Sequence, residues 1–347
     1  MGAAGSDTGD GTAIAIAHDD PPALGVYSWS ADNGFGDKFS NPSSVINHSS
    51  RDVDFSPDGT AIAVAHKNSP YITVYAWSGF SGFGSKFSNP STLPAGTTYS
   101  VAFSPDSSAL AVGHKNSPYV TAYAWSGSGF GSKYSNPSTL PANYGRDVVF
   151  NHNGSAIAVA HSSSPYVTVY PWSGSGFGTK YSNPSTLPSF GANSVQTVTF
   201  NHDSSVIVME GSISSVYIHA YAWSGSGFGS KFSDPSSAAT DGPNDLAFNN
   251  DSSALALVHG SSPYVEVYAW SGSGFGSKYS NPSTLPPNTS EGVEFSPDGT
   301  ALAVAHLSSP RVTVYPWSGS GFGTKYSNPS GTLQAGRAVA FNTPPEE

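Results

Sequence analysis

The chain has 347 residues, only 10% of them charged, and a formal net charge of −10 at pH 7. Phosphate binding needs a basic stripe, so 13 lysines and arginines against 23 acidic residues exclude nucleic acid as a partner. The absence of cysteine excludes disulfides and thiolate metal sites, and no apolar run is long enough to predict a membrane span.

The tryptophans divide the chain into repeats. The chain contains seven tryptophans, spaced 48, 48, 47, 51, 47 and 47 residues apart. They are Trp29, Trp77, Trp125, Trp172, Trp223, Trp270 and Trp317. A period of this length, with several short β-like runs in every copy, is typical of propeller blades.

Each copy predicts four strands, which in the second copy cover residues 52–56, 60–66, 71–77 and 83–88. Pro57-Asp58-Gly59 predicts a tight turn between the first two, because proline presets the turn and glycine accepts a left-handed conformation. The second strand alternates alanine with isoleucine and valine, so both of its faces are apolar. A strand of this kind is buried on both sides, as in radially stacked sheets.

The two ends of the chain predict how the ring closes. The first copy begins at its second strand, residues 12–18, and its missing first strand returns as residues 337–342. We therefore predict an all-β, seven-bladed β-propeller of four-stranded antiparallel blades, in which the C-terminal strand completes the N-terminal blade. Residues 1–347 are expected to form a single domain. The fifth copy departs from the pattern, with Gly211 at the place of a repeated histidine.

The repeat resembles the WD-repeat β-propeller family, on the strength of FSPDGTALAV at residues 295–304 and its copies. Tryptophan is followed by serine here, where the family usually has aspartate. The segment YAWSGSGFGSKYSNPSTLP at residues 123–141 is also similar to repeat proteins encoded by bacterial viruses and environmental bacteria. These resemblances imply an interaction scaffold.

Two polar residue types recur once per copy. Histidine ends the second strand in six copies, at His18, His66, His114, His161, His259 and His306. Rotation about the ring axis spreads these side chains over separate blades, so we expect turn caps and no metal site. Lysine occupies the predicted outer strand of every copy, where it blocks edge-to-edge pairing.

The copies differ most at the start of the first strand and in the loop before it. Rigid scaffolds carry binding residues on such loops, so these positions predict a binding site at one mouth of the central channel. The predicted site residues are Arg51, Tyr99, Tyr144, Arg146, Phe190, Gln196, Asn244, Glu291 and Arg337.

No catalytic constellation is visible in the sequence. We therefore predict that the protein is not an enzyme, binds no cofactor, and acts as a virion-associated or extracellular assembly or attachment protein with protein partners. The alternative is a multivalent, lectin-like glycan-binding propeller with one site per blade. The N-terminus has neither the basic start nor the apolar stretch of a signal peptide, so release by lysis or non-classical export is expected.

Overall fold

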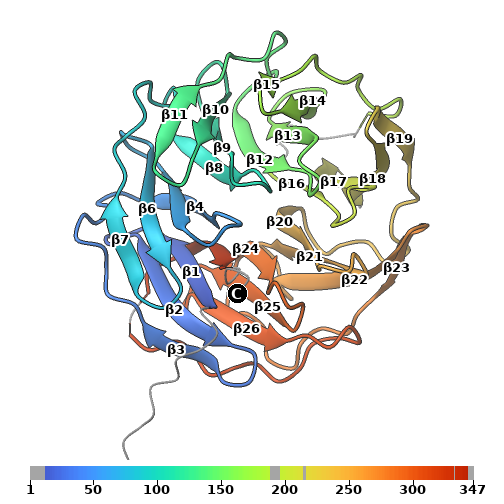
Figure 1. Cartoon of the computed structure of the whole chain (residues 1–347). Coiled ribbons are helices and arrows are strands. Elements are labelled where there is room, and N and C mark those ends of the chain that lie inside the picture. Colours follow the sequence, from blue (N-terminus) through green and yellow to red (C-terminus); the bar gives the residue numbers. More distant parts are fainter. Residues whose placement is uncertain (1–11, 188–195, 214–215, 332, 343–347) are drawn as a thin grey trace, which may run out of the picture.

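The computed structural model describes residues 12–187, 196–213, 216–331 and 333–342, and it forms a ring of seven antiparallel sheets (Figure 1). Six sheets have four strands; in the seventh, β24, β25 and β26 are followed by a single bridge between Trp317 and Phe322. The all-β, seven-bladed architecture predicted from the repeats is confirmed. No helix in the described part of the chain could cross a membrane.

The strands of each blade follow one another outward from the ring axis. The innermost strands are β4 (Ser50–Phe55), β8 (Thr98–Phe103), β12 (Gly145–Phe150), β16 (Val198–Phe200), β20 (Pro243–Phe248), β24 (Ser290–Phe295) and β27 (Gly336–Phe341). The second strands are β1 (Ala13–His18), β5 (Ala61–His66), β9 (Ala109–His114), β13 (Ala156–His161), β17 (Val206–Ile213), β21 (Ala254–His259) and β25 (Ala301–His306). The third strands are β2 (Leu24–Ser30), β6 (Ile72–Ser78), β10 (Val120–Trp125), β14 (Val167–Ser173), β18 (Val216–Ser224), β22 (Val265–Ser271) and β26 (Val312–Pro316). The outer strands are β3 (Gly34–Lys38), β7 (Gly82–Lys86), β11 (Phe130–Lys133), β15 (Gly176–Phe177), β19 (Gly227–Lys231) and β23 (Gly274–Lys278).

The last strand closes the ring as predicted. β27 pairs antiparallel with β1, with Ile14 opposite Phe341 and Ile16 opposite Val339. Because this pairing covers the inner edge of β1, the first blade is completed by the two ends of the chain. The predicted turn is also found, since Gly59 has a φ of 68°.

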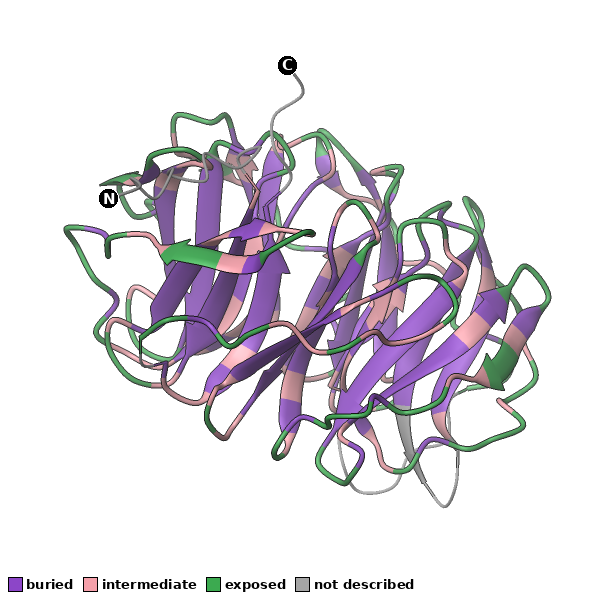
Figure 2. Ribbon diagram, turned by 90° about the horizontal axis from the view of Figure 1, so that it is seen from below, coloured by how far each residue is buried: buried purple, intermediate pink, exposed green. Residues whose placement is uncertain are grey.

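The core lies between neighbouring blades, where a small face meets a large one. Ala61, Ala63 and Ala65 of β5 pack against the next blade, in one cluster with Leu110 and Val112 of β9. All five side chains are fully buried. Figure 2 shows the consequence: the strands are buried along most of their length, while exposed residues lie mainly in the loops.

Each tryptophan joins two blades. The ring of Trp77 lies 5.1 Å from Phe83 of its own blade and 5.1 Å from Phe39, which follows the outer strand of the preceding blade. The same contact across the seam joins Tyr326 to Trp29 at 5.0 Å. Edge-to-face pairs of this kind add about 0.5–1.5 kcal/mol each to the burial of the rings. The tryptophans that mark the repeats in the sequence therefore also pack neighbouring blades together.

The repeated histidines face the third strand of their own blade. His66 Nε2 lies 3.1 Å from Thr73 Oγ1, and His114 Nε2 lies 2.9 Å from Thr121 Oγ1. Burial lowers the pKa of both imidazoles to about 4, so they are neutral at pH 7. These pairs satisfy a buried ring nitrogen inside the blade.

Candidate functional site at the mouth of the channel

The starts of the innermost strands meet at one end of the ring. Seven of the nine predicted site residues line a common hollow of about 100 Å³ there: Arg51, Tyr99, Arg146, Gln196, Asn244, Glu291 and Arg337. Among the remaining two, Tyr144 packs its ring 6.5 Å from Tyr119 and does not line this hollow. Phe190 lies outside the described residues. We call this hollow the mouth.

One arginine of the mouth is neutralised by acidic neighbours. Arg337 Nη2 lies 2.5 Å from Asp19 Oδ2, and its Nη1 lies 3.2 Å from Glu291 Oε2. Burial alone would raise the pKa of Asp19, but hydrogen bonds from Arg337 and from Ser49 Oγ, at 2.6 Å, hold it below its ordinary value. Arg337 therefore acts mainly as a link between neighbouring blades.

The other two arginines of the mouth, Arg51 and Arg146, each have a hydrogen-bond donor without a partner among the described residues. The Arg146 guanidinium carbon lies 4.8 Å from the centre of the Tyr99 ring, which is a cation–π contact. The Nε atoms of Arg51 and Arg146 are buried and have no hydrogen-bond partner among the described residues. A buried donor without a partner costs free energy, so both arginines are suited to hold an oxygen acceptor.

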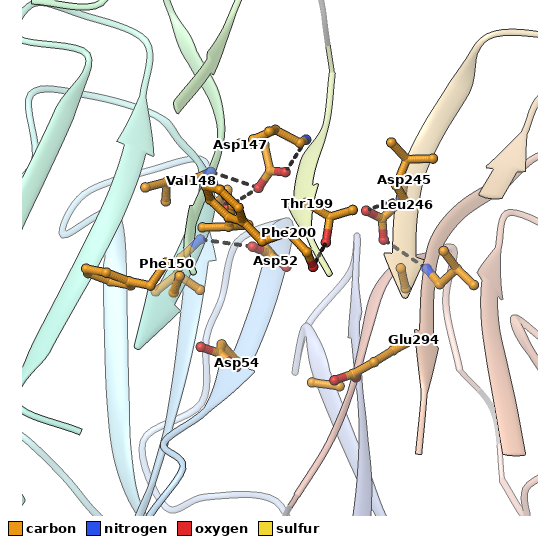
Figure 3. A pocket seen from close by; sticks show the side chains of 18 of the residues that line it. Asp52, Asp54, Asp147, Val148, Phe150, Thr199, Phe200, Asp245, Leu246 and Glu294 are labelled. Atoms are coloured by element: carbon orange, nitrogen blue, oxygen red, sulfur yellow. Dashed lines mark hydrogen bonds between the residues drawn. The ribbon is translucent and has the colours of Figure 1, made fainter. Parts of the chain in front are cut away.

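Carboxylates lie directly below the mouth. Asp52, Asp147 and Asp245 line both the mouth and the channel, which has a volume of about 330 Å³. Asp54 and Glu294 lie deeper in the same channel (Figure 3). Burial raises the pKa of Asp52 to about 7 and that of Asp245 to about 8. These groups therefore gain and lose protons near neutral pH.

Each of these carboxylates also accepts a backbone hydrogen bond from the next blade. Asp52 Oδ2 accepts from Val101 N, at 2.9 Å. The other four bonds are Asp54 Oδ2 from Phe103 N, Asp147 Oδ2 from Val198 N, Asp245 Oδ2 from Val293 N and Glu294 Oε2 from Phe341 N. The inner edge of an innermost strand has no partner strand, so its N–H groups need such acceptors. We call these five bonds the carboxylate clasps.

The sequence contained a signal for the clasps that was not interpreted. One position near the start of the innermost strands alternates between an acid and a small hydroxyl residue over five blades. Its residues are Asp52, Ser100, Asp147, Thr197 and Asp245. Ser100 Oγ donates to Asp147 Oδ1 at 2.8 Å, and Thr197 Oγ1 lies 3.2 Å from Asp245 Oδ1. The alternation therefore builds a hydrogen-bonded arc around the mouth.

A further carboxyl group was missed in the irregular fifth blade. Glu210 of β17 stands where Ala65 stands in β5, and its side chain is buried. Its Oε2 accepts from the backbone N–H of Gln196, at 2.5 Å, and burial raises its pKa to about 8. Since Gln196 lines the mouth, Glu210 fixes the backbone of one mouth residue.

Comparison with solved structures gives similar propellers. A periplasmic gluconolactonase from Pseudomonas aeruginosa is 16% identical, with a TM-score of 0.65 over 96% of this chain and 100% of its own. A protein described as "putative 6-phosphogluconolactonase" from Bacteroides uniformis is 13% identical, with a TM-score of 0.71 over 95% of this chain and 99% of its own. A protein so described from Bacteroides fragilis is 9% identical, with a TM-score of 0.70 over 95% and 97%. No family model and no curated protein sequence matches the chain.

At these identities the similarity establishes the fold. It also corrects two predictions. The chain was expected to be a non-enzymatic assembly or attachment protein, or alternatively a lectin, and not an enzyme; propellers described as lactonases contradict both expectations. A search for local motifs could not register the acidic residues of the mouth, because the ring brings them together from different blades.

Proposed function

We propose that the protein is a hydrolase that opens a small lactone of a polyhydroxylated acid at the mouth. One observation carries the proposal: the unpartnered donors of Arg51 and Arg146 share a hollow with Asp52, a carboxyl group whose pKa is about 7. The descriptions of three structurally similar proteins as lactonases agree with it. The fold alone would not decide the function.

The mouth offers the groups that lactone hydrolysis needs. Tyr99, Gln196 and Asn244 present uncharged polar groups, which suit the hydroxyls of such a substrate. Arg51 can hold the carbonyl oxygen and stabilise the negative charge that forms on it. Asp52 can accept a proton from water as that water attacks the carbonyl carbon.

The proposed step balances without a cofactor. The water oxygen forms a bond to the carbonyl carbon, and Asp52 takes its proton. The bond between that carbon and the ring oxygen then breaks, and the proton passes from Asp52 to the departing oxygen. The product is the open hydroxy acid. A base with a pKa near the working pH is the most effective for such a transfer.

The test measures hydrolysis of gluconolactone and of its 6-phosphate by purified protein. It compares variants of two aspartates of the propeller, Asp52 and Asp245. Asp52 follows Arg51, whereas Asp245 follows Asn244, and both accept a backbone bond of 2.9 Å from the next blade. We expect D52N to lower kcat by about 10²–10⁴-fold. The matched D245N variant should stay within a few-fold of wild type. No hydrolysis above the spontaneous rate, or equal losses in both variants, would overturn the assignment.

The repeat family, the location of the protein and its partner remain predictions. A relationship of the repeat to WD-repeat propellers is supported by the FSPDGTALAV segments, and a profile built from these copies would test it. The expected virion or extracellular location, and a protein partner at the mouth, would be tested by co-purification from a producing culture. An enzyme can occupy either place.

A further inference from the structure

Two histidines lie side by side at the end of the channel opposite the mouth. His152 is in the turn between β12 and β13, and His202 is in the corresponding turn between β16 and β17 of the next blade. Their ring centres are 4.4 Å apart and the rings are tilted by 43°. An innermost strand of six residues spans about 20 Å, so the pair is well separated from the mouth.

The turn itself does not require histidine. The corresponding residues in the other copies are Pro57, Pro105, Asn250, Pro297 and Thr343. Proline or asparagine favours such a turn, whereas histidine has no special preference for it. Histidine thus replaces a good turn residue in two adjacent blades, where rotation about the ring places the two rings in contact.

The environment of the pair favours metal binding over charge. Two protonated imidazoles at this distance would repel one another. Both side chains are exposed to solvent at their turns, so a metal ion can reach the ring nitrogens. Neutral imidazole is the form that binds a metal. His152 also lines the channel, so an ion there could be reached by solvent.

From this geometry we infer that His152 and His202 bind one divalent transition metal ion, with copper(II) held more tightly than zinc(II). Each imidazole nitrogen would lie about 2.0–2.1 Å from a zinc ion, so the rings must be close neighbours. No group of three metal-binding side chains occurs among the described residues. Water therefore completes the coordination, and the ion keeps exchangeable positions that face the channel.

A second histidine pair provides the control. The ring centres of His48 and His66 are 6.2 Å apart, His48 Nδ1 is 3.2 Å from Asn68 Nδ2, and His66 Nε2 is 3.1 Å from Thr73 Oγ1. These nitrogens already have partners inside the protein. H48A should therefore leave metal binding unchanged, which also tests whether surface histidines bind copper adventitiously.

The experiment is titration of the full chain with CuCl₂ and ZnCl₂ by calorimetry, together with electron paramagnetic resonance of the copper form. We expect one equivalent bound, with nitrogen couplings from two imidazoles, and a loss of affinity of at least about tenfold in both H152A and H202A. Circular dichroism will verify that the variants are folded. Absence of a bound equivalent, retention of affinity in either variant, or an equal loss in H48A would overturn the inference.

Discussion

The wall of the propeller and its channel follow opposite rules. In the wall, formed by the second and third strands, one solution recurs: His66 with Thr73 is repeated as His114 with Thr121. In the channel, formed by the innermost strands, neighbouring blades differ: Asp52 is followed around the ring by Ser100. Repetition serves closure of the ring, while departures from it place distinct groups around one small space.

Titratable groups show the same contrast. Burial lowers the pKa of the wall histidines to about 4, so they are neutral at pH 7. Burial raises the pKa of the channel acids Asp52 and Asp54 to about 7. The repeated histidines of the wall are therefore uncharged groups with fixed partners, whereas the channel holds groups whose charge changes close to neutral pH.

The sixth blade shows what it takes to put a charge into the wall. Glu266 occupies the position of Thr73, and its side chain is fully buried. Its carboxylate lies 2.9 Å from Lys278 Nζ and accepts from Thr240 Oγ1, at 2.5 Å. Burial would raise the pKa of Glu266, but these partners lower it overall. The wall thus accommodates an ion only together with its counter-ion.

The largest effect is expected from opening the wall. Deleting residues 336–347 removes β27 and uncovers the inner edge of β1, including Ile14 and Ile16. Both side chains are completely buried in the intact ring. We predict loss of cooperative unfolding, measured by thermal circular dichroism, with aggregation in size-exclusion chromatography. A truncated chain that melts like the intact one would contradict the role of β27 as the closing strand.

The next largest loss of stability is expected from K278A, which leaves the buried Glu266 carboxylate without its counter-ion. Removing one partner of a buried ion pair costs about 3–5 kcal/mol, and Thr240 should keep the loss near the lower limit. The control is K86A, because among the described residues the Lys86 ammonium bonds to Asn89 Oδ1 and a backbone carbonyl and to no carboxylate. Urea unfolding should show about 3 kcal/mol for K278A and less than about 0.5 kcal/mol for K86A. Similar losses of unfolding free energy in the two variants would show that the buried ion pair is no more important for stability than a lysine without a carboxylate partner.

The repeated pair itself can be broken with T121V, which keeps the shape but removes the hydroxyl group bonded to His114 Nε2. A buried polar atom left without a partner costs about 1–3 kcal/mol. We expect a loss of stability in this range by urea unfolding, with no change in lactone hydrolysis. A stable variant with altered hydrolysis would mean that wall and mouth are coupled.

The pH dependence of stability should separate channel from wall. Asp54 has a pKa of about 7 in the fold and an ordinary value of 3.8, so the folded protein binds a proton that the unfolded chain lacks between these values. Its stabilising contribution is therefore complete below pH 3.8 and is lost as the pH rises through 7. The buried histidines have the opposite effect, because their contribution to stability rises with pH up to about 6.5. Between about pH 6.5 and 8 the change in stability therefore comes from the buried acids.

We therefore expect wild-type stability to fall as the pH rises from 6.5 to 8, and to fall less steeply in D54N. Asparagine keeps an oxygen that can accept from Phe103 N, so the variant retains the clasp. Urea unfolding at several pH values measures both slopes. Equal slopes would show that Asp54 is not protonated in the folded protein near neutral pH.

Sequence reasoning captured what depends on local periodicity. Tryptophan spacing, strand alternation and the split first blade predicted the ring, and variation at the strand starts predicted residues that meet at the mouth. The clasps, Glu210 and the contact between His152 and His202 were not predicted. Each depends on which residues about 50 positions apart become neighbours after one rotation of the ring, and on burial, which shifts a pKa only in three dimensions.

An odd number of blades has a consequence for parity. The arc that alternates acid and hydroxyl runs from Asp52 to Asp245, but strict alternation cannot close around seven positions. The two left over are Gly292 and Ala338 at the seam. A Cβ added to Gly292 would lie 2.8 Å from the Ala338 Cα, so glycine lets the two backbones approach where no side chain mediates. The departure from alternation is thus confined to these two neighbouring blades, which the Glu291–Arg337 ion pair joins. It makes the repeated blades of the ring distinguishable from one another.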